Sequence, residues 1–324
     1  MGSAEHTGEF PKMRIKSFLL QFARVLALIL LSIGITALNP NFLKATNLIN
    51  VVRQASPQII MAVGMTVVLL TGGIDLSVGS VMTLAGVIAG YFLTQTELPW
   101  VVGLLAGLAT GILSGMVNGL MVAKVKLSAP IATYGMLWIG KGLSFAIMGA
   151  SPFFGFCDAF RYMGRGILLG IPVPIWIMVF VVAIVFLFLQ YTTLGRSIYA
   201  IGANPSAARA SGIRVDRTLL YAYMLSGLLA ALAGEVLCAR LNAVDQGIGD
   251  PFLLPAIASP VMGGTSMAGG EGGVGGTVIG SLIMVVLANG MNLLGISSLW
   301  QQFVIGFVVV LAVWLDVVIK KRQE

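Results

Sequence analysis

The stretch LGRSIYAIGANPSAARASGIRVDR, residues 194–217, is the longest polar interruption in a chain that is otherwise nearly all apolar. Uncharged runs lie on both sides of it, at residues 166–193 and 218–234, and each is long enough to belong to a membrane-spanning helix. The stretch between them must therefore face water. Cytoplasmic loops carry the excess of Lys and Arg, so the cytoplasmic side is predicted by its four arginines: Arg196, Arg209, Arg214 and Arg217.

A short helix is predicted in the middle of this stretch. Asn204 can cap a helix, and Pro205 is tolerated at the first helical position. The small residues 206–211 continue the helix, and Gly212 ends it. An ordinary Arg-rich loop would carry a similar pattern, so these residues alone leave both interpretations open.

Composition places the chain among polytopic membrane proteins. Its 324 residues are 58% hydrophobic and only 10% charged, whereas soluble domains carry about 25% charge. The basic residues are scattered between apolar segments and form no single stripe, which argues against nucleic-acid binding. One His and two Cys give no metal-site spacing, and we expect no cofactor. Whether Cys157 and Cys238 pair stays open, with free thiols favoured.

The expected fold is an all-α bundle of about ten transmembrane helices. Thirteen of the 19 basic residues then lie at inner positions, which predicts that both termini are cytoplasmic. The domain plan is a tail at 1–16, a permease domain at 17–319 with a cytoplasmic loop at 192–217, and a tail at 320–324. The expected spans are residues 17–38, 55–71, 76–93, 100–123, 129–149, 171–191, 218–239, 252–263, 275–294 and 299–318.

Small residues recur every fourth position in two places. Missing side chains let a neighbouring helix backbone approach, as in the small-xxx-small packing of membrane helices. Two such ladders with opposite directions suggest an inverted repeat, although two unrelated packed helices would look the same. The first ladder is Gly103, Gly107, Gly111, Gly115 and Gly119, and the second is Gly264, Ala268, Gly272, Gly276 and Gly280.

Polar residues at membrane depth are candidates for a substrate pathway. Asp75 lies between two spans and either caps the next helix or contacts substrate. Glu235 and Asp316 lie near span ends and are expected to reach interfacial water. Neutral amides suit an uncharged polyol, but for any single one of them interhelical hydrogen bonding is the favoured explanation. The pathway candidates are Asp75, Asn118, Asn289, Asn292 and Gln301.

Four motifs occur in the order known from one family. They are GIDLSVGS at 73–80, GANPSAARASGIRVDR at 202–217, GGTS at 263–266 and NGMNLLG at 289–295. In these motifs the chain, from about Asn39 to Lys321, resembles the permease subunits of ribose-type ATP-binding cassette (ABC) importers. Glu271 and Pro260 depart from the family's usual residues, which affects the detail of the glycine-rich turn but not the fold.

The resemblance implies a vitamin B12-importer-like permease fold in the bacterial inner membrane. It also implies three partners: an ATPase subunit, a second permease chain and a sugar-binding protein outside. Ala207 and Ala208 would then be buried in a groove of the ATPase, and Arg209 would pair with acidic groups at its rim. The residues expected to couple the permease to the ATPase are Asn204, Pro205, Ala207, Ala208, Arg209, Ser211, Gly212 and Ile213.

Two other functions remain as alternatives. An ion-coupled secondary transporter would need buried acidic residues, and Asp75 is the one good candidate in the sequence. An intramembrane enzyme would need a catalytic constellation, and none is evident. The glycines form no G-x-x-x-x-G-K-[ST] loop, so the chain is not expected to hydrolyse ATP itself.

Overall fold

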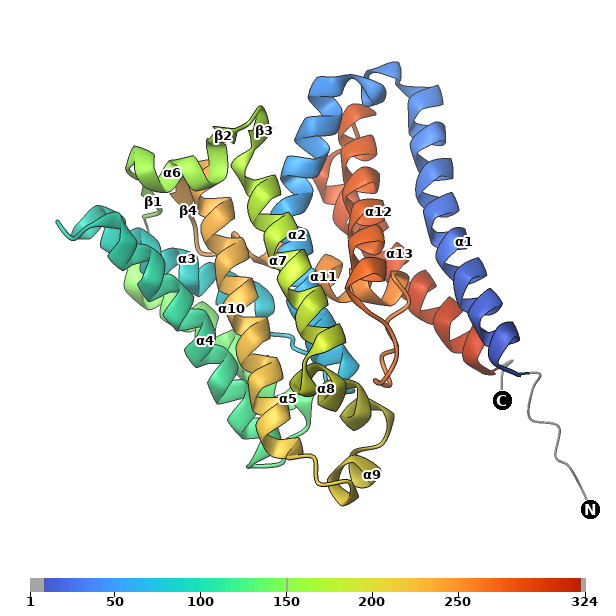
Figure 1. Ribbon diagram of the computed structural model, residues 1–324. Helices are drawn as coiled ribbons and strands as arrows, with labels where there is room; N and C mark the ends of the chain where they lie inside the picture. Colours follow the sequence, from blue (N-terminus) through green and yellow to red (C-terminus); the bar gives the residue numbers. More distant parts are fainter. Residues whose placement is uncertain (1–8, 150, 322–324) are drawn as a thin grey trace, which may run out of the picture.

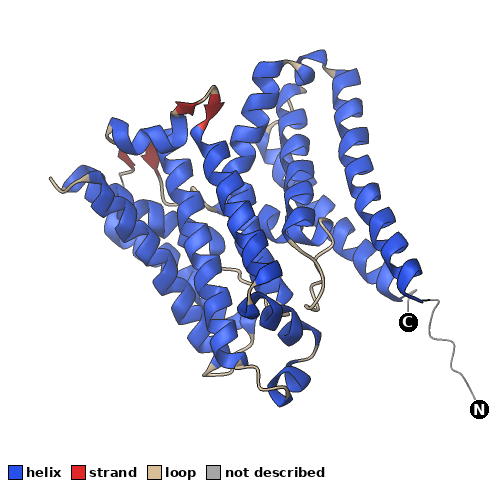
Figure 2. Cartoon of the chain, in the orientation of Figure 1, coloured by secondary structure: helices blue, strands red, loops and turns tan. Residues whose placement is uncertain are grey.

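The computed structural model describes residues 9–149 and 151–321, and these residues form a helical bundle with four very short strands (Figures 1 and 2). Ten helices coincide with the ten expected spans, which confirms a polytopic helical membrane protein. They are α1 (Glu9–Leu38), α2 (Ala45–Leu70), α3 (Val78–Gln95), α4 (Trp100–Ala123), α5 (Ala129–Met148), α7 (Val173–Tyr191), α10 (Val215–Leu241), α11 (Asp250–Met262), α12 (Val274–Leu293) and α13 (Ser298–Lys321).

Among the described residues, seven helices are long and apolar enough to cross a membrane. Within the side chains that are described, α1 and α13 have shorter apolar stretches at residues 24–38 and 299–311, and the whole of α11 has 13 residues. The short elements lie at the ends of the bundle: η1 (Pro40–Leu43), β1 (Phe153–Phe154), α6 (Asp158–Arg165), β2 (Ile167–Leu168), β3 (Ile171–Pro172), α8 (Thr193–Ala203), α9 (Pro205–Ala210) and β4 (Ala243–Val244).

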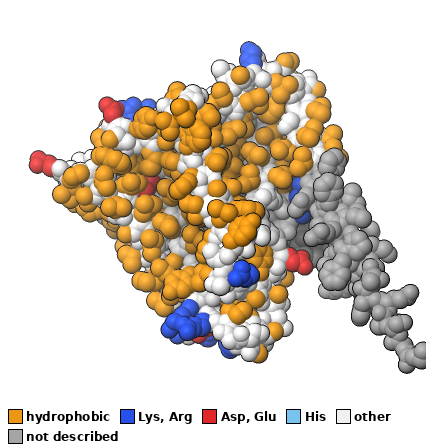
Figure 3. Space-filling view, in the orientation of Figure 1, with side chains coloured by type: hydrophobic (Ala, Val, Ile, Leu, Met, Phe, Trp, Pro, Cys, Tyr) orange, Lys and Arg blue, Asp and Glu red, His pale blue; other side chains and the backbone are white. Residues whose placement is uncertain are grey.

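The helices α2 and α10 form the centre of the bundle. They are the most buried of the spans, whereas only about a third or fewer of the residues of α4, α5 and α7 are buried. Hydrophobic side chains cover the flank of the molecule, as a lipid-facing surface requires, and Lys and Arg gather near the lower end (Figure 3). At that end α1 begins, α13 ends and α9 lies (Figure 1). The arrangement follows from ten spans joined by short connections.

The first glycine ladder packs α4 against α3 and α10. A Cβ atom on Gly111 would collide with the carbonyl oxygen of Gly227, and one on Gly115 would collide with that of Tyr223. All five glycines of the ladder are buried. The backbones of α4 and α10 therefore approach as closely as small-residue packing allows.

The second ladder runs from a loop into α12 and does not form one continuous helix face. Gly276 and Gly280 lie in α12, where Gly276 meets Gly263, just after α11, and Gly280 meets Ser259 of α11. Its earlier members lie in the loop before α12, where Gly264 and Gly272 have positive φ values. Only part of the pattern is helical because a run so rich in glycine favours turns. This ladder therefore lends no support to the inverted repeat, which stays a prediction.

Candidate coupling segment and buried polar cluster

The predicted short helix is present as α9, and its start is capped as expected. The side-chain oxygen of Asn204 accepts hydrogen bonds from the backbone N–H groups of Ser206 and Ala207, both at 3.0 Å. Pro205 occupies the first turn. The N–H of Asn204 still bonds to the carbonyl oxygen of Ala200 at 3.1 Å, so one residue ends α8 and begins α9.

The end of α9 has the geometry of a Schellman motif. Ile213 N–H donates to Ala208 O at 3.1 Å, and Gly212 N–H donates to Arg209 O at 3.0 Å. Gly212 has φ +81°, the left-handed conformation that favours glycine. With both termini fixed by local bonds, α9 is a defined helix and not a pliable loop.

The side chain of Ala208 was expected to face a partner, but it points toward the chain itself. It is 4% exposed and packs in a small cluster with Ile201 of α8 and Val215 of α10. So short a helix places its one apolar face against its own chain, which buries the side chain of Ala208. Contact of Ala208 with the ATPase stays a prediction. The exposed members of the predicted coupling set are Asn204, Pro205, Ala207, Arg209, Ser211 and Gly212, while Ile213 is half-buried.

Helix α8 precedes α9 and was missed by the sequence reasoning. Thr192 caps it by accepting a hydrogen bond from Gly195 N–H at 3.0 Å. Its signal was present, because Leu194, Ile198 and Ile201 recur at helical spacing. Ile198 and Ile201 are both buried, so the pattern marks the face on which α8 packs.

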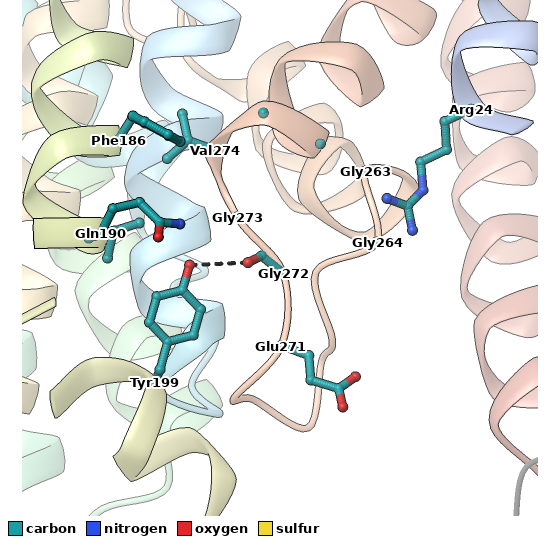
Figure 4. A pocket seen from close by; sticks show the side chains of 13 residues that line it. Arg24, Phe186, Gln190, Tyr199, Gly263, Gly264, Glu271, Gly272, Gly273 and Val274 are labelled. Atoms are coloured by element: carbon teal, nitrogen blue, oxygen red, sulfur yellow. Dashed lines mark hydrogen bonds between the residues drawn. The ribbon is translucent and has the colours of Figure 1, made fainter. Parts of the chain in front are cut away.

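The glycine-rich loop at residues 263–273, which connects α11 to α12, contacts both α8 and the end of α2. The hydroxyl of Tyr199 in α8 donates to the carbonyl oxygen of Gly272 at 3.1 Å (Figure 4). Gly270 N–H donates to the carbonyl oxygen of Leu70, the last residue of α2, at 3.0 Å. A Cβ atom on Gly202 of α8 would collide with that same carbonyl oxygen. These contacts hold α8, α2 and the loop together.

A cavity of about 440 Å³ opens beside this junction. Phe186 and Gln190 of α7 line it on one side, and the loop lines it on the other (Figure 4). Arg24 of α1 reaches toward Gly264 from the far side of the loop. The cavity thus lies directly next to the α8–α9 segment.

Asp75 is the centre of a buried polar cluster between α3, α4 and α10. It is 1% exposed, and its Oδ1 accepts from the N–H and the hydroxyl of Ser77 at 2.9 and 2.6 Å. Ser226 of α10 donates to its Oδ2 at 3.1 Å, and Asn118 of α4 donates to Ser77 Oγ at 2.8 Å. Asp75 therefore orders the turn before α3 and ties that turn to α10. The N-cap residue of α3 is Ser77, and no side chain caps the helix, so Asp75 is not a direct helix cap.

The other pathway candidates lie elsewhere. Asn289 of α12 pairs with Asn47 of α2 at 3.1 Å, where α2 begins and α12 ends. Gln301 donates to Asn292 Oδ1 at 2.7 Å. By their hydrogen bonds the five candidates form three separate groups: Asp75 with Asn118 through Ser77, Asn289 with Asn47, and Asn292 with Gln301. Sequence reasoning missed further polar contacts of α2, such as Thr66 with Thr277 at 2.6 Å.

Comparison with known proteins identifies the family. A protein family described as "Branched-chain amino acid transport system / permease component" matches residues 47–313. The chain belongs to this permease family. No solved structure matches it.

Several curated relatives are similar over nearly their whole length. Ribose import permease protein RbsC of Escherichia coli (strain K12) is 43% identical over 305 residues, which cover 93% of this permease and 95% of that protein. RbsC of Bacillus subtilis (strain 168) is 43% identical over 293 residues, covering 90% and 91%. D-allose transport system permease protein AlsC of Escherichia coli (strain K12) is 35% identical over 298 residues, covering 92% and 91%.

The side chain of Glu235 in this permease lies in a different environment from the one expected. It was predicted to reach interfacial water, but its side chain is completely buried within α10. The prediction was wrong because α10 continues to Leu241 and because Gly107 of α4 leaves room for the carboxyl group. Among the described residues, neither carboxyl oxygen of Glu235 has a hydrogen-bond partner. Asp316 lies outside the residues whose side chains are described.

The two cysteines of the permease are free thiols. Cys157 is exposed just before α6, and Cys238 is buried in α10. The structure therefore favours the free-thiol alternative over a disulfide.

Proposed function

We propose that this chain is the membrane-spanning permease subunit of an ATP-driven importer and that it passes ribose or a similar monosaccharide into the cytoplasm. The observation that carries the proposal is the 43% identity to proteins named as ribose import permeases, over more than nine-tenths of the chain. The D-allose relative widens the substrate class to other monosaccharides. The family description itself names branched-chain amino acids, so the sugar assignment rests on the relatives.

The partners would be an ATPase subunit, a second permease chain and a soluble sugar-binding protein. The α8–α9 segment is the proposed docking site of the ATPase, since it is a locally fixed helix pair at one end of the bundle (Figure 1). Its exposed residues Pro205, Ala207 and Arg209 are the proposed contacts. In this arrangement α8–α9 and both termini lie in the cytoplasm, and the bundle spans the bacterial inner membrane.

The contacts of α8 suggest how a push on α9 reaches the membrane. Asn204 joins α9 to α8 without a flexible linker, so a displacement of one moves the other. Gly202 and Gly270 hold α8 and the glycine-rich loop against the end of α2. Because α2 is the most buried helix, its movement would repack the centre of the bundle.

An ion-coupled secondary transporter remains the second candidate, and one observation favours it. Glu235 adds a second deeply buried carboxyl group to Asp75, and such groups are typical of ion-coupled transport. Against this stands the similarity to importer permeases along the whole chain.

Reconstitution separates the two functions. The permease is placed in liposomes with its ATPase and binding protein, and uptake of labelled ribose is measured. We expect uptake only when ATP and both partners are present, with no effect of an ionophore. Uptake by the permease alone, abolished by an ionophore, would establish the secondary transporter instead.

A further inference from the structure

The turn between α4 and α5 contains a backbone conformation that its sequence does not favour. Lys126 has φ +65°, in the left-handed region that non-glycine residues seldom adopt. Glycine would adopt the same conformation without strain. A lysine at this position therefore implies a use for its side chain, because strained residues persist where the surrounding structure requires them.

The side chain of Lys126 joins three elements at the end of the bundle. Its Nζ lies 2.8 Å from Oδ1 of Asp216, in the first turn of α10. The same oxygen is 3.9 Å from Nη2 of Arg209 in α9. All three side chains are at least one-third exposed, and exposed ion pairs contribute little to stability. Their value is therefore in fixing how the three elements lie relative to one another.

Helix α4 connects this ion cluster to the buried polar cluster. Asn118, toward the same end of α4, donates to Ser77, which in turn donates to Asp75. We propose that Lys126 is a positioning residue that fixes α9 to the end of α4 through Asp216, so that α4 moves with α9 when the ATPase moves it. The proposal rests on the proposed function for its consequence, but the attachment of α9 to α4 can be tested without the ATPase.

Simpler uses of a basic residue do not account for Lys126. A topology signal or a contact with acidic lipid headgroups needs a positive charge anywhere in the turn, and Lys124 supplies one without left-handed backbone. Only the pair with Asp216 requires a positive charge at residue 126 itself.

The first test compares variants in the reconstituted importer. Lys126→Gly removes the charge and also relieves the backbone, so a purely structural role predicts no loss. We expect the sugar taken up per ATP hydrolysed to fall roughly two- to fivefold, the range open to an exposed ion pair. Lys126→Arg, which keeps the charge, should behave as the wild type. An unchanged ratio in Lys126→Gly would overturn the proposal.

The second test uses the purified permease alone and measures hydrogen exchange of the backbone amides of residues 207–213. Exchange should be faster in Lys126→Gly and in Asp216→Asn, and the double variant should be no faster than either single one. Additive effects, or no effect, would show that Lys126 does not fix α9. A wild-type permease without ATP-dependent uptake would refute the proposed function and leave this measurement valid.

Discussion

The hydroxyl of Tyr199 in α8 donates a hydrogen bond to the carbonyl oxygen of Gly272, 3.1 Å away, and so ties the candidate coupling segment to the loop before α12. Burial raises the pKa of Tyr199 above its ordinary value, so the hydroxyl keeps its proton near neutral pH and remains a donor. In the proposed topology, this bond joins an element outside the membrane to a loop that leads into a membrane-spanning helix.

Removing that hydroxyl should weaken coupling more than folding. We expect Tyr199→Phe to lower ribose uptake about two- to tenfold, the range that corresponds to one net hydrogen bond, while the ATPase still co-purifies. Tyr221→Phe serves as the control, since Tyr221 is a half-exposed tyrosine of α10. Equal uptake in the two variants would mean that the Tyr199 bond has no part in transport.

A leucine at Gly111 should disrupt the seam between α4 and α10. The Cβ atom alone would collide with the carbonyl oxygen of Gly227, and the remaining side chain has no space. We expect a loss of stability of about 1–3 kcal/mol or more, seen as a lower melting temperature in detergent. Gly142→Leu is the matched control, because no atom lies within 4 Å of a Cβ atom at Gly142. If both variants have the melting temperature of the wild type, the close packing at Gly111 does not contribute to stability.

The two ends of the bundle should lie on opposite sides of the membrane. A reporter fused after Arg209, in α9, should be active only in the cytoplasm. One fused at Arg161, in α6, should be active only outside, because these helices lie at opposite ends (Figure 1). Activity of both fusions on the same side would rule out the topology of ten spans.

The sequence predicts the features of this permease that depend on neighbouring residues. Hydropathy located the spans, and Asn204 and Gly212 marked the ends of α9, because capping needs only residues within one helical turn. The orientation of Ala208 and the burial of Glu235 could not be predicted in this way. Both depend on which distant helix packs alongside, and a single sequence does not specify that partner. The group of Asp75 with Asn118 was likewise visible only once α3 and α4 were side by side.

Two neighbouring alanines of α9 should respond differently to the same substitution. Ala207 is exposed, so Ala207→Glu should change stability by no more than about 0.5 kcal/mol and yet abolish co-purification of the ATPase. Ala208 is buried against Ile201 and Val215, so Ala208→Glu places a carboxylate in an apolar cluster. We expect it to destabilise the permease by on the order of several kcal/mol. Binding of the ATPase to a folded Ala207→Glu variant would remove Ala207 from the docking surface.

The burial of Glu235 allows a direct test between an ATP-driven importer and an ion-coupled carrier. Glutamine has nearly the same shape, so Glu235→Gln should still fit beside Gly107 and leave the fold intact. In an ATP-driven importer no ion has to bind this group. We therefore expect uptake driven by ATP to stay within about twofold of the wild type, since an isosteric neutral side chain alters little of the packing.

In an ion-coupled carrier the carboxyl group would have to bind and release the coupling ion, and the same variant would abolish transport. Glu235→Lys is the companion variant, because a buried positive charge should impair folding in either case and so shows that the residue is enclosed. Loss of uptake in a stable Glu235→Gln protein would therefore argue for the carrier.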